Sequence, residues 1–155
     1  MNPSIADESV LDATLKRCMS NTKRFGCESM MIANLFPIVS TARSGMIAAA
    51  DRDGEENGEK NYRHIRSIAK TADLLIVGFG TDAGTIPKLA YSIPALQAAI
   101  GDLPVMTLRI TKNGLPSHPL YLPGDLDPIP YIWPTPPIKK RGFHEIDGRY
   151  IDRDA

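Results

Sequence analysis

Short apolar runs alternate with helical patterns along most of the chain, and this alternation constrains the fold more than any other feature. Three runs have the length of one strand covered on both faces, at residues 29–34, 73–78 and 104–110. The segments with helical spacing or composition are residues 10–25, 62–72 and 87–99. The alternation predicts an α/β fold: a three-layer sandwich with a central, mainly parallel sheet and a site along the carboxyl ends of its strands.

Glycine and proline residues mark where these elements end or bend. Gly26 follows the first helical segment and is typical of a helix end. Pro94 lies inside the third helical segment and predicts two short helices or one kinked helix. Residues 35–58 read as a loop that includes a solvated acidic stretch, and the sequence at 112–114 predicts a turn after the third strand.

The chain beyond Leu122 has a different composition from the part before it. Its stretch DLDPIPYIWPTPPIKKRG is so dense in proline that no regular elements are expected there. We expect an extended segment that packs on the domain through Tyr131, Ile132 and Trp133, followed by a loosely held polar tail. The sequence therefore predicts an α/β domain at residues 1–122 and a proline-rich segment at residues 123–155.

Charge and cysteine usage limit the classes of function. Eighteen basic and eighteen acidic residues cancel, so any contact with nucleic acid must be local. Cys18 and Cys27 have no CxxC spacing and no second pair, and are expected to be free thiols of a reduced cytoplasm. No stretch approaches the roughly 18 apolar residues of a membrane span, and no ligand cluster or GxGxxG motif implies a metal or redox cofactor. The composition predicts a cytoplasmic protein without metal, cofactor or membrane contact.

Polar motifs follow the predicted strands. Asn34 ends the first run, glycines at 78 and 80 end the second, and Ser117-His118-Pro119 follows the third. The opening Asn2-Pro3-Ser4 has the form of a turn after a strand, because proline fixes its own φ and pushes the preceding residue towards extended backbone. Since the carboxyl ends of parallel strands meet at one edge of a sheet, these motifs are expected to share one rim.

The order and spacing of these motifs resemble two families. Members of the uracil-DNA glycosylase superfamily carry a GxNP-type or GQDPY-type motif after the first core strand, an asparagine after the second and an HPS-type motif after the last. The runs NPSIADESVLDATLKR, ANLFPIVST and KNGLPSHPLYL more closely resemble the bacterial and phage family called domain of unknown function 1643, over about residues 1–122. The resemblance implies a glycosylase-like fold and a protein that hydrolyses the N-glycosidic bond of a base in DNA or in a nucleotide.

The resemblance implies catalytic roles for three residues. Asn2 would position the attacking water, and Asp7 would act as a base or polarise that water. His118 would donate a hydrogen bond to a base carbonyl oxygen as charge accumulates there. The alternatives are a turn-forming Asn-Pro, a helix cap at Asp7 or Asp12, and a surface histidine in a proline-rich turn.

Further residues are expected to contact the substrate. Asn34 would read a base edge through its amide, and Phe36 would stack on a base or fill the core. Lys112, Arg17 and Lys16 would contact phosphates, unless they are solvated charges. The substrate-binding set is Ser4, Asn34, Phe36, Phe79, Gly80, Lys112 and Ser117, with Arg17 as the phosphate-binding residue.

The start of the chain departs from the family pattern. Relatives have an apolar strand ahead of NPS, whereas only Met1 precedes this motif here. We therefore expect the first core strand to be missing, with Met1 as its last residue. Restoring an upstream strand is expected to stabilise the sheet, because an unpaired edge invites association.

Two other functions fit the same residues. A noncatalytic module would recognise a modified base or a partner protein through the same pocket. A generic nucleotide-binding protein would use residues 78–84 as a phosphate loop, although this loop lacks the GK[ST] ending. Convergence of Asn2, Asn34 and His118 on one cleft would favour the glycosylase and the binding module over the nucleotide-binding protein.

Overall fold

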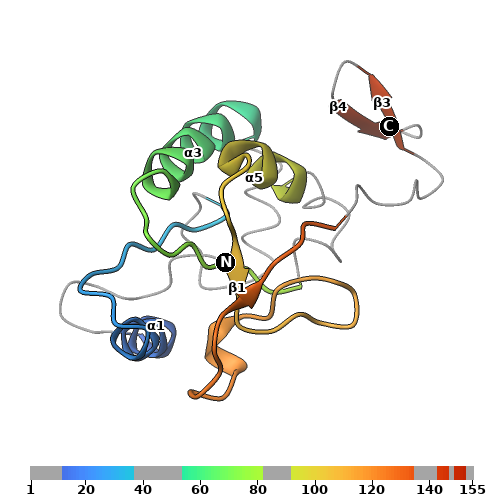
Figure 1. The fold of residues 1–155 in the computed structure, drawn as a ribbon. Coiled ribbons are helices and arrows are strands. Elements are labelled where there is room, and N and C mark those ends of the chain that lie inside the picture. Colours follow the sequence, from blue (N-terminus) through green and yellow to red (C-terminus); the bar gives the residue numbers. More distant parts are fainter. Residues whose placement is uncertain (1–11, 37–53, 82–91, 135–142, 147–148, 153–155) are drawn as a thin grey trace.

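The computed structural model describes residues 12–36, 54–81, 92–134, 143–146 and 149–152 (Figure 1). Within these ranges the chain forms three α-helices, one short 3-10 helix, a two-stranded antiparallel sheet and a separate β-hairpin. The predicted mixed α/β class is confirmed at this level. None of the described helices is long and apolar enough to cross a membrane.

The first helix, α1 (Ala13–Arg24), begins and ends with well-defined caps. The Asp12 carboxylate accepts a hydrogen bond from the Leu15 N–H at 2.7 Å, which satisfies one of the helix's free amide donors. At the other end Gly26 adopts a φ of 74°, a conformation that glycine reaches without steric cost. The predicted helix and its stop at Gly26 are therefore confirmed, and Asp12 is the capping residue.

Two further helices pack against each other. The helix α3 (Gly54–Ala69) corrects the prediction that residues 35–58 are loop throughout, because its first turn begins inside that range. The helix α5 (Ser92–Ile100) contains Pro94 in its first turn. A missing N–H costs nothing there, since the first four amides of a helix have no partner within it, so residues 92–100 form one helix. Residues 37–53 and 82–91 lie outside the described parts.

The extended segments in the centre of the molecule are joined by only a few of the backbone hydrogen bonds that hold strands together in a sheet. Ile76 and Met106 form one parallel bridge, in which the Met106 N–H donates to the Leu75 oxygen and the Val77 N–H donates to the Met106 oxygen, both at 2.8 Å. The strand β1 (Met106–Thr107) pairs antiparallel with β2 (Ile129–Pro130). The predicted strand at 104–110 is thus reduced to two residues and the one at 73–78 to a single bridge, so no parallel sheet forms within the described ranges.

The predicted strand at residues 29–34 is wrong. These residues form no strand, and the side chains of Met31 and Ile32 are 60% and 48% exposed. A strand requires a neighbour that pairs with its backbone N–H and C=O groups, and no described segment pairs with this one. The apolar run therefore lies at the surface.

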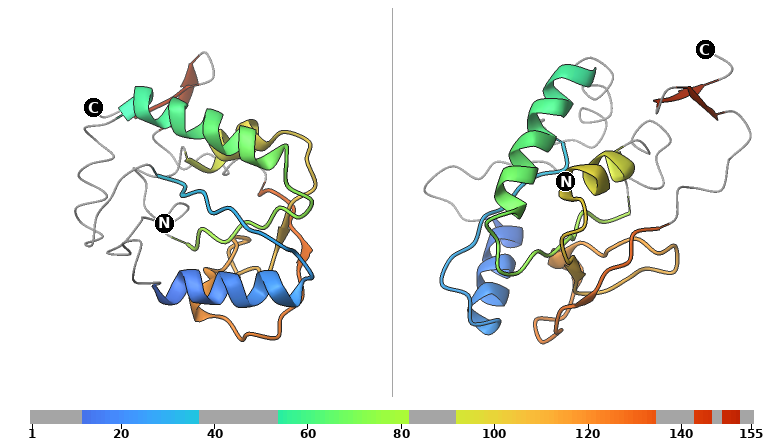
Figure 2. Two further views of the ribbon diagram at one scale, coloured as in Figure 1. Left: turned by 90° about the vertical axis from the view of Figure 1, so that its left-hand side faces the viewer. Right: turned by 45° about the horizontal axis from the view of Figure 1, so that its top comes forward.

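The helices lie on two sides of these extended segments. Figure 1 and the left view of Figure 2 show α3 and α5 on one side and α1 on the other. In that view of Figure 2 the segment after α1 and the segment after α3 run in the same direction between the helices. Each helix is thus followed by a return of the chain through the middle of the molecule.

The buried core collects side chains from α3, α5 and the extended segments. Its members are Leu35, Phe36, Ile65, Ala69, Val77, Phe79, Ile93, Leu96, Ile100, Val105, Leu115 and Tyr131. Tyr131 donates a hydrogen bond to the Gly114 oxygen at 3.3 Å, and its ring meets that of Trp133 edge-on with centroids 5.2 Å apart. The predicted packing through Tyr131 and Trp133 is confirmed. Ile132 is 84% exposed, because neighbouring side chains of an extended segment point to opposite sides.

Regular elements also form where the proline-rich composition predicted none. Besides β2, residues beyond Leu122 form β3 (Phe143–Ile146) and β4 (Arg149–Asp152). These two strands pair antiparallel, with Phe143 opposite Asp152 and Ile146 opposite Arg149. The prediction that residues 125–142 form no regular elements is therefore wrong at β2, where Pro130 lies and one missing N–H is tolerated at a sheet edge. The strands β3 and β4 lie in the stretch that was expected to be a loosely held polar tail, and residues 143–152 contain no proline.

Candidate functional site

A short hairpin carries the Ser117-His118-Pro119 motif back to the second extended segment. Its turn lies at residues 111–114, where the Gly114 N–H donates to the Thr111 oxygen at 3.0 Å and Gly114 has a φ of 75°. The Ser117 N–H then donates to the Arg109 oxygen at 2.8 Å. The predicted turn at 112–114 is confirmed, and it fixes where the motif begins.

Two glycines let the motif pack directly on residues 78–80. A Cβ on Gly78 would lie 2.9 Å from Cδ of Pro119 and 3.0 Å from its Cγ, distances that a side chain cannot adopt without displacing its neighbours. The Gly80 N–H donates to the Pro116 oxygen at 3.1 Å, and a Cβ on Gly80 would be 3.6 Å from that of His118. Gly80 also has a φ of 79°, which side chains rarely adopt. The structure therefore brings together three predicted site residues: Gly80, Ser117 and His118.

His118 caps the 3-10 helix η2 (Pro119–Tyr121) with its own side chain. Its Nδ1 accepts a hydrogen bond from the Leu120 N–H at 3.4 Å. The ring is half-buried, and this burial is the main reason that the pKa of His118 lies below its usual value of 6.5. The Asp12 carboxylate at the start of α1 opposes the shift and raises the same pKa, although by less.

The bond to Leu120 also settles which nitrogen of the neutral ring carries the proton. Because Nδ1 accepts, the proton of a neutral His118 is on Nε2. The side chain is thus prepared to donate one hydrogen bond from Nε2 without carrying a positive charge. A neutral imidazole of this kind can polarise a carbonyl oxygen or stabilise charge that develops there.

Tyr121 lies beside His118 and was missed by the reasoning from sequence. The two ring centroids are 5.7 Å apart with planes tilted by 50°, yet the tyrosine side chain is 75% exposed. An aromatic residue three positions after the histidine of a proline-containing turn is the signal that could have indicated it. We call Gly80, Ser117, His118 and Tyr121 the His118 site.

The other described residues that were predicted to bind substrate lie in the core, beside α3 or at the hairpin turn. Phe36 and Phe79 are buried members of the core, which is the position that the core-filling alternative describes for Phe36. The backbone oxygen of Asn34 accepts a hydrogen bond from the Asn61 side chain of α3 at 3.1 Å. Lys112 is exposed at the hairpin turn. Asn2, Ser4 and Asp7 lie outside the described residues, so the predicted convergence with Asn2 stays a prediction.

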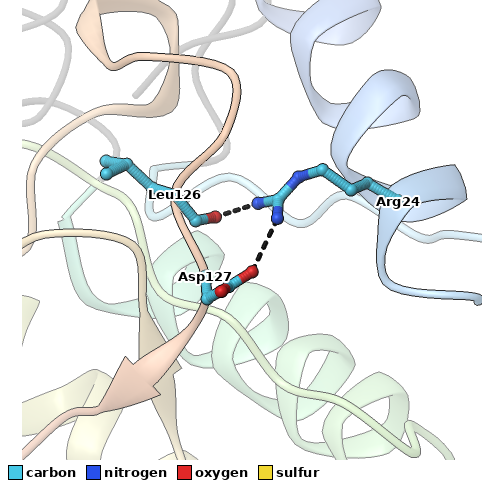
Figure 3. A network of polar contacts seen from close by, with 3 residues as sticks. All are labelled: Arg24, Leu126 and Asp127. Carbon is cyan, nitrogen blue, oxygen red and sulfur yellow. Dashed lines mark hydrogen bonds and ion pairs between the residues drawn. The ribbon is translucent and has the colours of Figure 1, made fainter.

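The loop after η2 runs along α1. Near the middle of the helix, Nη1 of Arg17 is 2.6 Å from where a Cβ on Gly124 would lie. At its end, Arg24 forms an ion pair with Asp127 at 2.6 Å and also donates to the Leu126 oxygen (Figure 3). Together with the contacts between α1 and η2, these interactions hold the His118 site against the first helix.

No group of three or more histidine, cysteine, aspartate or glutamate side chains gathers in a metal-binding arrangement among the residues that the structure describes. Cys18 and Cys27 are free thiols, as the sequence predicts. Burial raises the pKa of the Cys18 thiol, and the Asp12 carboxylate adds to this effect. Cys18 therefore lacks the environment of an activated nucleophile.

Comparisons with known proteins give a family but no characterised relative. Neither the curated proteins nor the solved structures contain a significant match to this chain. One family model matches residues 1–120, which include α1, α3, α5 and the His118 site up to Leu120. The chain thus belongs to the family described as "protein of unknown function (DUF1643)".

Proposed function

We propose that this protein handles a nucleobase and hydrolyses the N-glycosidic bond of a modified base, in DNA or in a nucleotide. The observation that carries the proposal is the His118 ring, whose Nδ1 accepts from the Leu120 N–H and whose pKa is lowered mainly by burial, so that the neutral ring carries its donor on Nε2. When a base departs, negative charge develops on its carbonyl oxygen or ring nitrogen. A fixed neutral donor at that position stabilises the charge more than it stabilises the intact substrate.

The arrangement of the chain supports the finer fold that the proposal requires. A glycosylase-like sandwich has a central parallel sheet between two layers of helices. Here the segments after α1 and α3 run in the same direction, helices lie on both sides of them, and the bridge between Ile76 and Met106 is parallel. The His118 site lies where the 73–80 segment ends, which is the edge at which such folds bind ligands.

The remaining roles in the proposal come from the family resemblance. Asn2 positions the attacking water through its amide oxygen, and Asp7 polarises that water or accepts its proton. Asn34 reads the edge of the base. The partner is the nucleotide or a short stretch of DNA, bound through local contacts because the chain has no net charge.

Single-turnover release of a labelled base tests the proposal. The substrates are a panel of modified and unmodified oligonucleotides and nucleotides, and the variant is His118→Asn, which keeps an oxygen to cap η2 but removes the Nε2 donor. We expect the release rate to fall roughly 10²-fold with little change in substrate affinity. His64→Asn, at an exposed position on α3, is the matched control and should retain the wild-type rate.

Two results would contradict the proposal in different ways. Equal losses of affinity and rate in His118→Asn would make His118 a docking residue. Binding of a base by the wild type without release from any substrate would identify the protein as the noncatalytic module that recognises a modified base.

A further inference from the structure

An exposed aromatic ring flanks the proposed base site. Tyr121 is 75% exposed while its ring contacts that of His118, and it belongs to η2, the element that His118 caps. A tyrosine that only completed the core would be buried, as Tyr131 is at 5% exposure. Most of Tyr121 is therefore open to solvent, while its ring centroid lies 5.7 Å from that of the histidine proposed to contact the base.

A cationic helix lies beside the same element. The sequence of α1 contains Lys16, Arg17, Lys23 and Arg24 and no acidic residue, and α1 contacts η2. Arg17 and Arg24 face the loop at residues 124–127, whereas Lys16 and Lys23 are exposed. The two lysines are seven positions apart in sequence, so they lie on one face about 10 Å apart along the helix. In a chain of zero net charge this is a local concentration of positive charge.

We infer that the substrate of the His118 site is held within a single-stranded polynucleotide, whose neighbouring base stacks on Tyr121 and whose phosphates contact Lys16 and Lys23. This inference rests on the proposed function, and it specifies the class of substrate. An exposed ring beside cationic side chains is how proteins bind single strands, because every unpaired base offers a face for stacking and every nucleotide a phosphate. A free nucleotide would leave both Tyr121 and the helix unused.

Fluorescence anisotropy with a labelled oligothymidylate of about 12 nucleotides tests the inference directly. We expect Tyr121→Ala to weaken binding roughly tenfold and Tyr121→Phe to restore it, because stacking needs the ring and not the hydroxyl. The double variant Lys16→Gln/Lys23→Gln should lower the slope of log affinity against log salt by about 1.4, or about 0.7 for each lost phosphate contact. The matched control is Arg66→Gln/Lys70→Gln, which removes two exposed charges at the end of α3, on the other side of the extended segments.

The outcomes separate this inference from the proposed function. Release of base from nucleotides, with no binding of the oligonucleotide or with equal binding by all variants, would overturn the inference and leave the hydrolysis intact. Binding that depends on Tyr121 and on the α1 lysines, without release of any base, would support the inference and contradict the proposed hydrolysis. A salt slope lowered equally by the α3 control would overturn the assignment to α1, because it would show that only total charge matters.

Discussion

The protonation state of His118 follows from how its ring is held. Half-burial disfavours the charged imidazolium, and the bond from the Leu120 N–H to Nδ1 needs an unprotonated nitrogen. Both effects favour the neutral ring, and the Asp12 carboxylate only partly opposes them. One side chain therefore combines a structural role, as the cap of η2, with the donor that the proposed chemistry needs.

This arrangement makes the stability of the protein depend on pH. Because the folded-state pKa of His118 lies below the unfolded value of about 6.5, the unfolded chain takes up the proton first as the pH falls. The stabilisation is fully present above about pH 6.5 and is lost as the pH falls through the lower pKa of the folded state. We expect the difference in unfolding free energy between wild type and His118→Asn to decrease between about pH 7.5 and about pH 5, measured by urea denaturation.

The control for this titration is His64→Asn, which removes an exposed histidine from α3. If the difference in unfolding free energy between wild type and His118→Asn does not change with pH, the folded and unfolded states bind this proton equally.

Among the elements, the contact between residues 76–80 and η2 is the one that fixes the position of the His118 site. No side chain fits between Gly78 and Pro119, and the Gly80 N–H is bonded to the Pro116 oxygen. The sequence motif alone predicted that glycines end a strand at this point. It could not reveal that one of them makes room for a proline roughly 40 residues later in the chain.

Gly78→Ala is therefore expected to destabilise the protein by about 1 to 3 kcal/mol, because the new methyl group overlaps the Pro119 ring. Denaturant unfolding measures the loss. The same substitution at Gly58, inside α3, places its Cβ 4.0 Å from the Tyr62 ring and should stabilise by about 0.5 to 1 kcal/mol. Similar effects at both positions would mean that Gly78 and Pro119 are not packed as described.

Helices were easier to predict from the sequence than strands, for a physical reason. The pattern that indicates α1 is complete within 12 residues, because a helix satisfies its own backbone. Residues 29–34 are as apolar as a strand, yet a strand depends on a partner that local sequence does not specify, and Met31 and Ile32 are exposed. Similarly, β2 was not predicted, because its sequence is rich in proline and its partner Met106 is distant in sequence.

The candidate site was also predictable only in part. Ser117, His118 and Gly80 could be identified because their residue types and order resemble a known motif, and they do lie together. Tyr121 was missed because exposure of an aromatic ring is a tertiary property. Phe36 and Phe79 look the same in sequence whether they line a pocket or fill the core, and the structure buries both.

For the whole molecule, the segment beyond residue 122 matters because it supplies part of the core. We expect a chain that ends at Leu122 to lose β2 and the Tyr131 and Trp133 packing, and to melt on the order of 10 °C or more below the full chain. A chain that ends at Pro134 keeps these elements and should melt within a few degrees of it. Circular dichroism at increasing temperature compares the three. Equal melting of the Leu122 form would show that the α/β part is stable without the segment.

The contacts between α1 and the loop that runs beside it also affect how the chain folds during its synthesis. Arg24 and Asp127 are 103 residues apart in sequence, so at typical rates of synthesis roughly 5 to 20 s pass between them. A 12-residue helix is marginal without tertiary contacts. The inward face of α1 is therefore open to other nascent chains throughout that interval, and slower translation between the two residues lengthens the period in which they can associate.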